Sequence, residues 1–509
     1  MQDISLVVEK ARKAQSIWEA IPYSQKAKRI KKAGKCLAEI RDEVVEIIHR
    51  ENGKLATDAL AAEVIPALMA IPYYVSLGRK LCKPKAISGG NILMSYKRSK
   101  MVYKPWGVIG IISPWNYPFA IPFSDVITAL LAGNAVILKT ASVTPGAGKI
   151  IARILEAADL PEGLFTNIEI PGKEAGPALI SAGIDKLSFT GSTAVGKELT
   201  ILAAERLLPV ALELGGADAA IVCKDADIYR AVSGIIWAGF ANAGQSCGGA
   251  QRVIVHRDIY DKFMELLKIK TEALKPGNDL SCDLGPLINK KAKEEIRKQI
   301  NDCLSQGAKI AAQSRAFKTP DGNTAGTLDD DSLFAPAMVL TGVKTGMPII
   351  DDEIFGPVIS VAEFKDDKEA IELANTSPYA LTGSVWSRNK KYAMKLAAEI
   401  NAGSIMINDH LMSHGLAQTP WGGFGYSGTG RCHGEAGFRE MQKAKVVIND
   451  IIPGARREPW WQPYSEKIYN GLSALGDLLG GSFFKKIAAF PVVVKFFLIT
   501  WKKDGVKKD

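Results

Sequence analysis

The pattern of hydrophobic and polar positions differs between the first 85 residues and the rest of the chain. Residues 1–85 place apolar side chains three and four residues apart with few turn signals, which predicts a helical opening. From residue 101 the pattern changes to short apolar runs, such as AVILKT at 135–140, that alternate with helical stretches, such as FSDVITALLAG at 123–133. Apolar strands that alternate with helices are typical of parallel sheets buried on both faces.

The alternation continues after residue 250, where RVIVH at 252–256 and PVISVAEF at 357–364 predict further strands. The pattern as a whole predicts an α/β fold. Its most economical interpretation is two successive α/β domains that divide near residues 215–225.

Composition narrows the function classes. The 509 residues are 47% hydrophobic and 23% charged, which excludes disordered and fibrous chains. The seven cysteines are scattered without a C-x-x-C pair, so neither a disulfide framework nor a metal site is expected. The first twenty residues lack the apolar segment of a secretory signal, which favours a cytoplasmic location.

Charge argues against nucleic acid as a partner. The formal net charge is +10, but residues 451–509 hold ten Lys and Arg against five Asp and Glu, about half of the excess. The rest of the chain is only mildly basic and has no basic stripe with interleaved aromatic residues. No nucleic-acid partner is therefore expected.

A glycine-rich stretch, GSTAVGKE at 191–198, follows the predicted strand LSFT at 187–190. It nearly spells the P-loop G-x-x-x-x-G-K-[ST], but Glu198 stands where a magnesium-binding hydroxyl is required, which disfavours a nucleoside triphosphatase. Free backbone N–H groups at a helix N-terminus still suit the pyrophosphate of a dinucleotide. The plainer interpretation is a tight strand-to-helix turn.

Cys247 is the candidate nucleophile. It lies in NAGQSCGG at 242–249, where small residues would admit a substrate to the thiol and leave backbone N–H groups free for an oxyanion. A thiol attacks only as thiolate, so a base is needed, and Glu213 in ELGG at 213–216 is a candidate for the thiol or for a hydrolytic water. Taken singly, such a cysteine is more often an inert core residue.

Asn116 is the candidate oxyanion donor. It lies in SPWNYP at 113–118, where two prolines pin a short loop after an apolar run. A rigidly held side-chain amide can donate to a developing oxyanion. An asparagine that only caps a turn is the commoner case.

In this order and spacing, the stretches resemble the aldehyde dehydrogenase superfamily over about residues 5–450. Further motifs that carry the resemblance are ILKTASVTP around Lys139, EIFGPV at 353–358 and PWGGFGYSGTGR at 420–431. The chain is identified as a member on the coincidence of all these motifs.

The resemblance implies a Rossmann-like cofactor domain, an α/β catalytic domain and a small bridging hairpin that makes homodimers or dimers of dimers. The implied ranges are 1–87 and 107–215 for the cofactor domain, 216–435 for the catalytic domain, 88–106 and 436–450 for the bridging and oligomerisation segment, and 451–509 for a C-terminal extension.

The resemblance also implies oxidation of an aldehyde to a carboxylic acid with NAD or NADP. Cys247 would form a thiohemiacetal and then a thioester, Asn116 and the Cys247 backbone N–H would form the oxyanion hole, and Glu213 would be the base for hydrolysis. Lys139 would bind the adenosine ribose, and Glu353 and Phe355 the nicotinamide ribose and ring. The implied cofactor-binding residues are Trp115, Lys139, Ser142, Gly191, Ser192, Thr193, Gly196, Glu353 and Phe355.

Two positions depart from the family pattern. Ser142 stands where NAD-preferring members often carry glutamate, and Ala217 replaces the usual lysine after ELGG. A carboxylate at 142 would accept hydrogen bonds from ribose hydroxyls and repel a 2′-phosphate. Because serine does neither strongly, the use of NADP stays open.

Two rival functions stay open on the sequence. One is a cysteine hydrolase or acyl transferase in which His256 activates Cys247. The other is an inactive family member with a structural role, although the presence of Cys247, Glu213 and Asn116 together argues against it.

The tail ends in an apolar run, 487–501, between Lys485-Lys486 and Lys502-Lys503. The run is too short for a spanning helix of about 20 residues and is interrupted by Pro491 and Lys495, so no transmembrane helix is expected. One interpretation is a tail packed on the core or on a dimer partner. The other is peripheral membrane contact through 471–509, as in membrane-associated fatty aldehyde dehydrogenases, for which long-chain aldehydes would be natural substrates.

Overall fold

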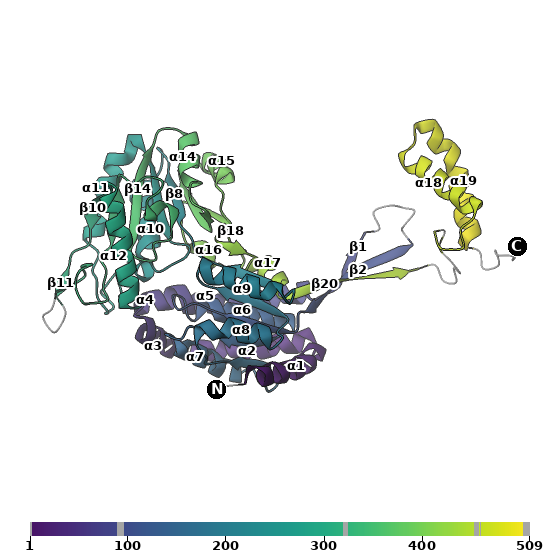
Figure 1. Cartoon of the computed structure of the whole chain (residues 1–509), viewed down its shortest axis with the longest axis horizontal. Helices are drawn as coiled ribbons and strands as arrows, with labels where there is room; N and C mark the ends of the chain where they lie inside the picture. Colours follow the sequence, from purple (N-terminus) through teal and green to yellow (C-terminus); the bar gives the residue numbers. More distant parts are fainter. Residues whose placement is uncertain (1–2, 89–95, 319–323, 452–457, 459, 502–509) are drawn as a thin grey trace. The chain divides into compact units, whose positions relative to one another are not determined.

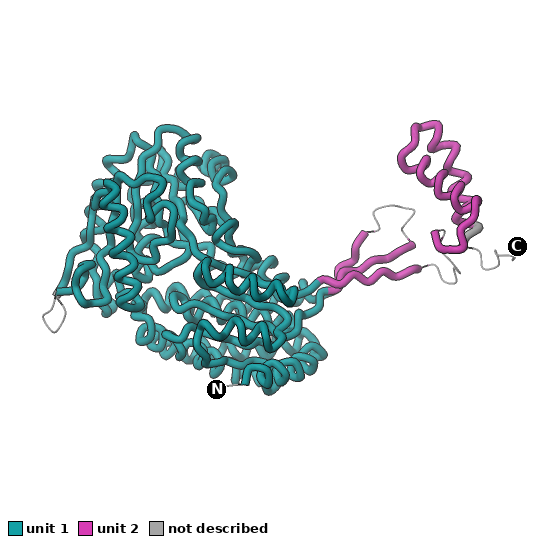
Figure 2. Tube along the Cα trace, in the orientation of Figure 1, with its two compact units in different colours: residues 1–83, 103–443 teal, residues 84–102, 444–509 magenta. Residues whose placement is uncertain are grey.

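The structure is a computed structural model that describes residues 3–88, 96–318, 324–451, 458 and 460–501. The chain forms two compact units (Figure 2): residues 1–83 with 103–443, and residues 84–102 with 444–509. Residues 89–95 of the predicted bridging hairpin and Lys502-Lys503 of the tail lie outside the described residues.

The first unit opens with helices, as the apolar spacing predicts. Asp3 caps the first of them by accepting a hydrogen bond from the Ser5 backbone N–H at 3.0 Å, and Gly53 ends the third in a left-handed conformation. The helices are α1 (Ile4–Ala20), α2 (Tyr23–Glu39), α3 (Arg41–Asn52), α4 (Ala56–Ala59) and α5 (Ile65–Leu81), with the π-helical turn η1 (Leu60–Val64) before α5.

A six-stranded sheet follows, in the order β19-β7-β6-β3-β4-β5. Its strands are β3 (Val108–Ile112), β4 (Ala135–Lys139), β5 (Phe165–Asn167), β6 (Lys186–Thr190), β7 (Val210–Glu213) and β19 (Gly428–Thr429). All neighbours pair in parallel except β19 with β7. The helices α6 (Ala120–Ala132), α7 (Pro145–Glu156), α8 (Gly172–Ser181) and α9 (Thr193–Ala204) connect the strands.

This strand order creates a place for a ligand. From the central strand β3 the chain moves to β4 on one side and later to β6 on the other. Loops at the carboxyl ends of the strands separate at such a switch point and leave a crevice between them. The segments after β3, β4, β6 and β7 therefore meet at one edge, and these segments contain the candidate residues Asn116, Lys139, Ser192 and Glu213.

The chain passes to a second sheet between Glu213 and Asp218 (Figure 1). Its order is β10-β13-β14-β9-β8-β16-β17, parallel except for β10 with β13. The strands are β8 (Asp218–Val222), β9 (Ala250–His256), β10 (Lys309–Gln313), β13 (Met338–Thr341), β14 (Val358–Phe364), β16 (Thr382–Trp386) and β17 (Ser404–Ile407).

Helices and short pairs complete this part of the unit. The helices are α10 (Ile228–Phe240), α11 (Tyr260–Glu272), α12 (Lys290–Ser305), α13 (Pro348–Asp351), α14 (Asp367–Ala374), α15 (Lys390–Glu399), α16 (Met412–Gly415) and α17 (Gly434–Glu440), with 3-10 turns η3 (Ala241–Gly244) and η4 (Arg257–Ile259). The short pairs are β11 (Phe317–Lys318) with β12 (Thr324–Ala325) and β15 (Tyr379–Ala380) with β18 (Phe424–Gly425).

The second unit holds a three-stranded sheet and a helical hairpin. The sheet has the order β1-β2-β20, from β1 (Lys85–Ile87), β2 (Lys97–Pro105) and β20 (Gln442–Asp450). The hairpin consists of α18 (Glu466–Gly480) and α19 (Phe483–Trp501), whose shared core includes Ile468, Val493 and Phe496. The helix α19 continues through Pro491 and Lys495, because packing on α18 stabilises a helix that lacks one backbone N–H donor at the proline.

One helix within the described ranges, Ala56–Leu81, is long and apolar enough by length and composition to cross a membrane. Val64, Tyr74 and Leu81 on this helix are buried in the core of the first unit. The apolar composition is therefore that of a core helix.

The predicted fold class agrees with the structure: two largely parallel sheets with helices form an α/β architecture. The ranges assigned to the cofactor, catalytic and bridging domains stay a prediction.

Candidate active site

Cys247 lies in the turn between η3 and β9, and the backbone before it is strained. Asn242, Ala243 and Gly244 have φ angles of 54°, 53° and 70°, all left-handed. For Ala243 this conformation is unfavourable because of its β-carbon, so surrounding contacts must hold it. Strain of this kind fixes the direction in which the following residues enter the site.

Asn242 supplies those contacts. Its backbone N–H donates to Asp58 Oδ2 at 3.0 Å, and its Nδ2 donates to the backbone carbonyls of Asn116 at 3.0 Å and Gln245 at 3.1 Å. The Asn116 Nδ2 donates to the same Gln245 carbonyl at 3.1 Å. One network therefore positions both the Asn116 amide and the cysteine turn.

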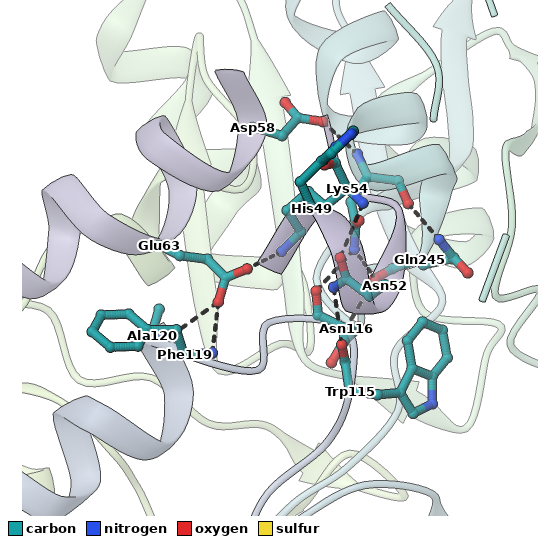
Figure 3. A network of polar contacts seen from close by, with 11 residues as sticks. His49, Asn52, Lys54, Asp58, Glu63, Trp115, Asn116, Phe119, Ala120 and Gln245 are labelled. Carbon is teal, nitrogen blue, oxygen red and sulfur yellow. Dashed lines mark hydrogen bonds and ion pairs between the residues drawn. The ribbon is translucent and has the colours of Figure 1, made fainter. Parts of the chain in front are cut away.

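The same network extends to the residues that anchor the loop around Asn116. Asn52 Nδ2 donates to the Trp115 carbonyl at 3.1 Å, and the Lys54 ammonium pairs with the Glu63 carboxylate where both side chains are fully buried. Glu63 Oε2 accepts hydrogen bonds from the backbone N–H groups of Phe119 at 2.8 Å and Ala120 at 3.1 Å, at the start of α6 (Figure 3). The loop that presents Asn116 is thus anchored on both sides.

Two glycines after Glu213 let three segments meet. A β-carbon on Gly216 would lie 2.1 Å from the Cys247 carbonyl oxygen, and one on Gly215 would lie 2.5 Å from Glu353 Oε2. Glu353 Oε1 accepts a hydrogen bond from the Gly216 backbone N–H at 3.1 Å. Only residues without side chains permit these approaches, which bring the Cys247 turn and Glu353 to the end of β7.

Glu213 is the last residue of β7 and is only 7% exposed. Neither of its carboxylate oxygens has a hydrogen-bond partner among the described residues. Burial raises the pKa of Glu213 well above its usual range, the Asp125 carboxyl raises it further, and the Arg431 guanidinium opposes the shift. A buried carboxylate with free acceptor positions is costly unless a ligand or water uses it.

The Cys247 thiol is half-buried and faces acidic neighbours. Burial raises the pKa of Cys247, and the carboxylates of Glu353, Asp218 and Glu213 raise it further. The resting thiol therefore holds its proton. Its backbone N–H has no hydrogen-bond acceptor among the described residues, so it is free to donate to a bound group.

The cofactor candidates at β4 lie together. Lys139 ends β4 and is 3% exposed, and its Nζ donates to the Thr140 carbonyl at 2.5 Å and to Ser142 Oγ at 3.3 Å. Burial lowers the pKa of Lys139, and no carboxylate pairs with it within the described part of the chain. A buried ammonium without a counter-ion suits the hydroxyl or phosphate oxygens of a ligand.

The candidates at β6 form a strand-to-helix turn. Ser192 caps α9 by accepting a hydrogen bond from the Val195 backbone N–H at 3.5 Å, and Thr193 Oγ1 donates to the Tyr426 carbonyl at 3.0 Å. Gly191 leads into this turn, and a β-carbon on Gly196 would lie 2.7 Å from Leu214. The positive end of the α9 dipole therefore faces the strand edge, as an anion site requires.

The nicotinamide-side candidates flank the cysteine turn. Trp115 and Phe355 pack edge to face with ring centroids 5.5 Å apart. Glu353 Oε2 receives no hydrogen bond in the described part of the chain, and burial raises the pKa of Glu353 to about 8. With Lys139 and the start of α9, these groups present the acceptors, donors and apolar face that a dinucleotide needs.

A cavity of about 310 Å³ opens on Cys247 from the other side. It is lined by parts of α4, η1, α5, α6, α10 and α16, by the cysteine turn and by Trp421. This is the space in which a substrate can approach the thiol.

The structure separates His256 from Cys247, which contradicts the hydrolase pairing. Cys247 precedes β9, whereas His256 is the last residue of that strand, roughly 20 Å beyond Ala250 at about 3.3 Å per residue. The His256 Nδ1 accepts a hydrogen bond from the Asp258 backbone N–H at 3.2 Å, and its ring packs on Phe364. An extended strand of seven residues cannot bring the two together.

Sequence reasoning missed several residues of the site. Two of them, Tyr117 and Gln245, stand inside the motifs that contain Asn116 and Cys247. Their place beside these candidates is the signal that could have identified them. Asp58 on α4, Asp125 on α6 and Lys54 in the loop between α3 and α4 belong to no motif, and only the fold brings them to the site.

Known proteins share this architecture. The model of the "Aldehyde dehydrogenase family" matches residues 1–447. The 4,4'-diapolycopene aldehyde oxidase of Methylomonas sp. is 33% identical over 93% of this chain and 86% of its own length. A Mycobacterium ulcerans (strain Agy99) protein provisionally named succinate-semialdehyde dehydrogenase [NADP(+)] 2 is 34% identical over 88% of this chain and 84% of its own length.

Among solved structures, betaine aldehyde dehydrogenase from Staphylococcus aureus in complex with NAD+ is similar, with a TM-score of 0.83, 29% identity and coverage of 90% of this chain and 89% of that one. The family model spans most of the chain, and the relatives match it over most of their length. The chain therefore belongs to the aldehyde dehydrogenase family and is an enzyme of that family.

Proposed function

We propose that the protein oxidises an aldehyde to a carboxylic acid with NAD or NADP, through a covalent intermediate on Cys247. The observation that carries the proposal is the position of Cys247 between a substrate-sized cavity and the segment of Glu213 and Glu353. The relatives named for aldehyde oxidation and the neighbour bound to NAD+ support the same chemistry.

In the first step the thiol of Cys247 gives its proton to solvent and the sulfur bonds to the aldehyde carbon, giving a thiohemiacetal. The carbonyl oxygen becomes an oxyanion, which the Asn116 Nδ2 and the free Cys247 backbone N–H stabilise. A nicotinamide held beside Trp115 and Phe355 would supply the hydride acceptor, and the oxidised carbon would stay bonded to the Cys247 sulfur as a thioester.

Glu213 then acts as the general base. Its unpaired carboxylate takes a proton from a water molecule that attacks the thioester carbon, the carbon–sulfur bond breaks, and the sulfur recovers a proton. Burial raises the pKa of Glu213 toward the neutral pH range, and a general base is most effective when its pKa lies near the working pH.

For the cofactor, Lys139 would bind the adenosine ribose, the Gly191–Thr193 turn the pyrophosphate, and Glu353 the nicotinamide ribose through its free Oε2. Trp115, Phe355, Ser142 and Gly196 would shape the remaining surface. The buried, unpaired Lys139 ammonium is the observation that supports this assignment.

Cys247→Ala and Glu213→Gln test the mechanism. Cys247→Ala is expected to abolish oxidation, whereas Glu213→Gln should keep a rapid burst of reduced cofactor and slow the steady state by about 10²-fold to 10⁴-fold, because it removes only the base. Rapid-mixing absorbance at the wavelength of the reduced nicotinamide measures both. Cys36→Ala, on α2, is the matched control.

Loss of the burst in Glu213→Gln would contradict the base assignment. Turnover by Cys247→Ala near the wild-type rate would end the covalent mechanism. Hydrolysis of a thioester without any aldehyde-dependent reduction of NAD or NADP would instead indicate the hydrolase activity.

Ser142 bears on cofactor choice. Its hydroxyl lies 3.3 Å from the Lys139 ammonium and leaves a 2′-phosphate unopposed by negative charge. Ser142→Glu is expected to lower the ratio of kcat/KM with NADP to that with NAD by roughly tenfold or more. An unchanged ratio would remove the argument, and Ser142→Gln separates size from charge.

We also propose that the hairpin of α18 and α19 contacts a membrane surface. One face of α19 packs on α18, but Phe483, Ile487, Phe490, Val494 and Leu498 form a second apolar stripe and are 42% to 71% exposed. Lys485, Lys486 and Lys495 flank this stripe. Aromatic residues at the headgroup boundary beside lysines suit anionic lipid, and a cytoplasmic enzyme would meet such a surface.

Co-sedimentation with vesicles tests the membrane contact. The full chain should pellet with vesicles of phosphatidylcholine and phosphatidylglycerol, less so at high salt, and deletion of 471–509 should abolish this. Phe490→Asp should weaken binding, while Tyr469→Asp, on α18 and 73% exposed, should not. Equal sedimentation of the full and truncated chains would mean that the tail only packs on protein.

A further inference from the structure

The wall of the cavity at Cys247 is mainly aliphatic. Successive turns of η1 and α5 contribute Ala62, Ile65 and Met69, and α16 with the residue before it contributes Leu411 and Met412. Burial of substrate methylene groups against aliphatic side chains is favourable, whereas a polar substrate group finds no hydrogen-bond partner on them. The wall therefore selects for an apolar chain.

Charges in the wall are already balanced. Among the described residues that line the cavity, Lys54 is the only cation and Asp58 the only carboxylate. The Lys54 ammonium is paired with Glu63 and lies 3.9 Å from the Tyr117 ring centre, and Asp58 Oδ2 accepts the Asn242 backbone N–H. The Lys54 ammonium is therefore not free to pair with an anionic substrate, which would lose its hydration without compensation. Burial raises the pKa of Asp58, which favours its uncharged form and weakens it as a partner for a cationic substrate.

The rim of the cavity is apolar as well. Ile65, Met69, Trp237 and Met412 all line the cavity and are 42% to 49% exposed. Exposed apolar side chains from three elements at one opening are unusual on a soluble surface unless something apolar covers them. A chain longer than the cavity would continue over this rim.

The volume sets the length of the buried part. An apolar cavity of about 150 Å³ binds benzene, so 310 Å³ accommodates roughly twice its six carbon atoms. With the aldehyde carbon at Cys247, a chain of about six to ten carbons fills the space. Methionines at two places in the wall can adjust to chains of different shape.

We propose that the substrate is an uncharged, mainly aliphatic aldehyde of medium or longer chain, with its tail along Ala62, Ile65 and Met69. The inference rests on the proposed function, because it assumes attack by Cys247. It separates this chain from relatives named for succinate semialdehyde and betaine aldehyde, whose substrates carry a charge. The aromatic side chains in the wall are the feature that would favour a cation instead, and the comparison with betaine aldehyde below tests that alternative.

A substrate series tests the chain length. For acetaldehyde, butanal, hexanal, octanal and decanal, kcat/KM should rise by up to about fourfold per methylene, the factor that corresponds to ~0.8 kcal/mol, and then level off once the cavity is full. From acetaldehyde to hexanal the increase should be at least about tenfold. A flat or falling series would overturn the proposal.

Matched pairs of substrates test the charge. Pentanal should exceed succinate semialdehyde in kcat/KM by at least about 100-fold, and the uncharged tert-butyl analogue of betaine aldehyde should exceed betaine aldehyde, because each pair differs mainly in charge. A preference for either charged member would assign the cavity to that class instead.

A pair of variants places the chain in the cavity. Ile65→Asp, at the rim, should lower the ratio of kcat/KM for octanal to that for acetaldehyde by at least about tenfold. Ile269→Asp, on α11 and 58% exposed, should leave the ratio unchanged. Equal ratios in the two variants would move the binding path elsewhere.

The outcomes separate the two levels of proposal. If Cys247→Ala still oxidises aldehydes, the proposed function fails. If oxidation depends on Cys247 but favours charged or short aldehydes, only the substrate class fails.

Discussion

A second buried carboxyl group, that of Asp125 on α6, affects the pKa of Glu213. Burial raises the pKa of Asp125 to about 7, and the Ser188 hydroxyl, 3.3 Å away, opposes the shift. Glu440 also raises the pKa of Glu213, while Arg431 lowers it. Above about pH 7, where Asp125 is charged, it holds the proton on Glu213 and so limits the base.

Asp125→Asn should therefore increase thioester hydrolysis on the acidic side of the pH profile. Removing the negative charge lowers the pKa of Glu213, so the carboxylate form appears at lower pH, and the acid limb should move down by up to about one pH unit. Steady-state kcat between about pH 6 and 9 measures this. Asp42→Asn, whose side chain is 84% exposed, should leave the limb in place, and a limb that moves up in Asp125→Asn would contradict the coupling.

At Gly216 there is no room for even one added carbon atom. Because an added β-carbon would lie 2.1 Å from the Cys247 carbonyl oxygen, Gly216→Ala should displace the cysteine turn and lower kcat/KM by about 10²-fold. Gly172→Ala, at the start of α8 with no atom within 4 Å of the added carbon, is the control. Equal activity of the two variants would show that the cysteine turn tolerates displacement.

At this scale the sequence predicted what is local. Short motifs with small or rigid neighbours surround Cys247, Glu213 and Asn116. The sequence was therefore enough to propose these residues as site candidates, although their roles stay a prediction. Asp125 and Lys54 act through space across helices, and no spacing in the chain encodes those contacts. His256 was misplaced because a spacing of nine residues says nothing of the extended strand between it and Cys247.

Among elements, the buried pair Lys54 and Glu63 connects the end of α3 to the start of α6. Lys54→Met removes the ammonium and leaves the Glu63 carboxylate with only two backbone N–H donors, Phe119 and Ala120. An uncompensated buried charge costs about 3–5 kcal/mol. The apparent melting temperature should therefore fall clearly, as measured by calorimetry.

Lys13→Met is the matched control for this pair. Lys13 binds Glu9 at 2.6 Å on α1, but both side chains are more than half exposed, so no measurable change is expected. If the two variants melted alike, the buried pair would not anchor α6.

The element pattern was largely predictable because burial on both faces leaves a clear signal. All five residues of β4 are buried, as its apolar run suggested. The helix α19 was not predicted, because the apolar run was considered for membrane contact and packing and not for its secondary structure. Its packing against α18 stabilises it through Pro491, and such packing is invisible in the sequence.

For the whole molecule, we propose that a second copy of the chain pairs at β20, as the predicted dimer requires. The strand lies at an edge of the three-stranded sheet and exposes Val446, Val447 and Ile448 by 44% to 65%. An exposed apolar edge strand is prone to pair with another chain. Domain assembly at this scale depends on a partner that one sequence does not describe.

Val447→Asp should therefore shift the protein from dimer, or dimer of dimers, to monomer. Light scattering coupled to size-exclusion chromatography measures the mass, and Leu280→Asp, 79% exposed elsewhere, should not change it. An unchanged mass in Val447→Asp would place the subunit contact on another surface.

The three carboxylates around Cys247 also have a consequence for the life of the enzyme in an oxidising cell. Peroxides attack the thiolate, and burial, together with the acidic groups Glu353, Asp218 and Glu213 beside the sulfur, keeps it as a thiol while no turnover takes place. An idle enzyme would thus resist conversion of its nucleophile to the sulfenic and sulfinic acids. The same arrangement that delays the attack on aldehyde lengthens the working lifetime of each molecule.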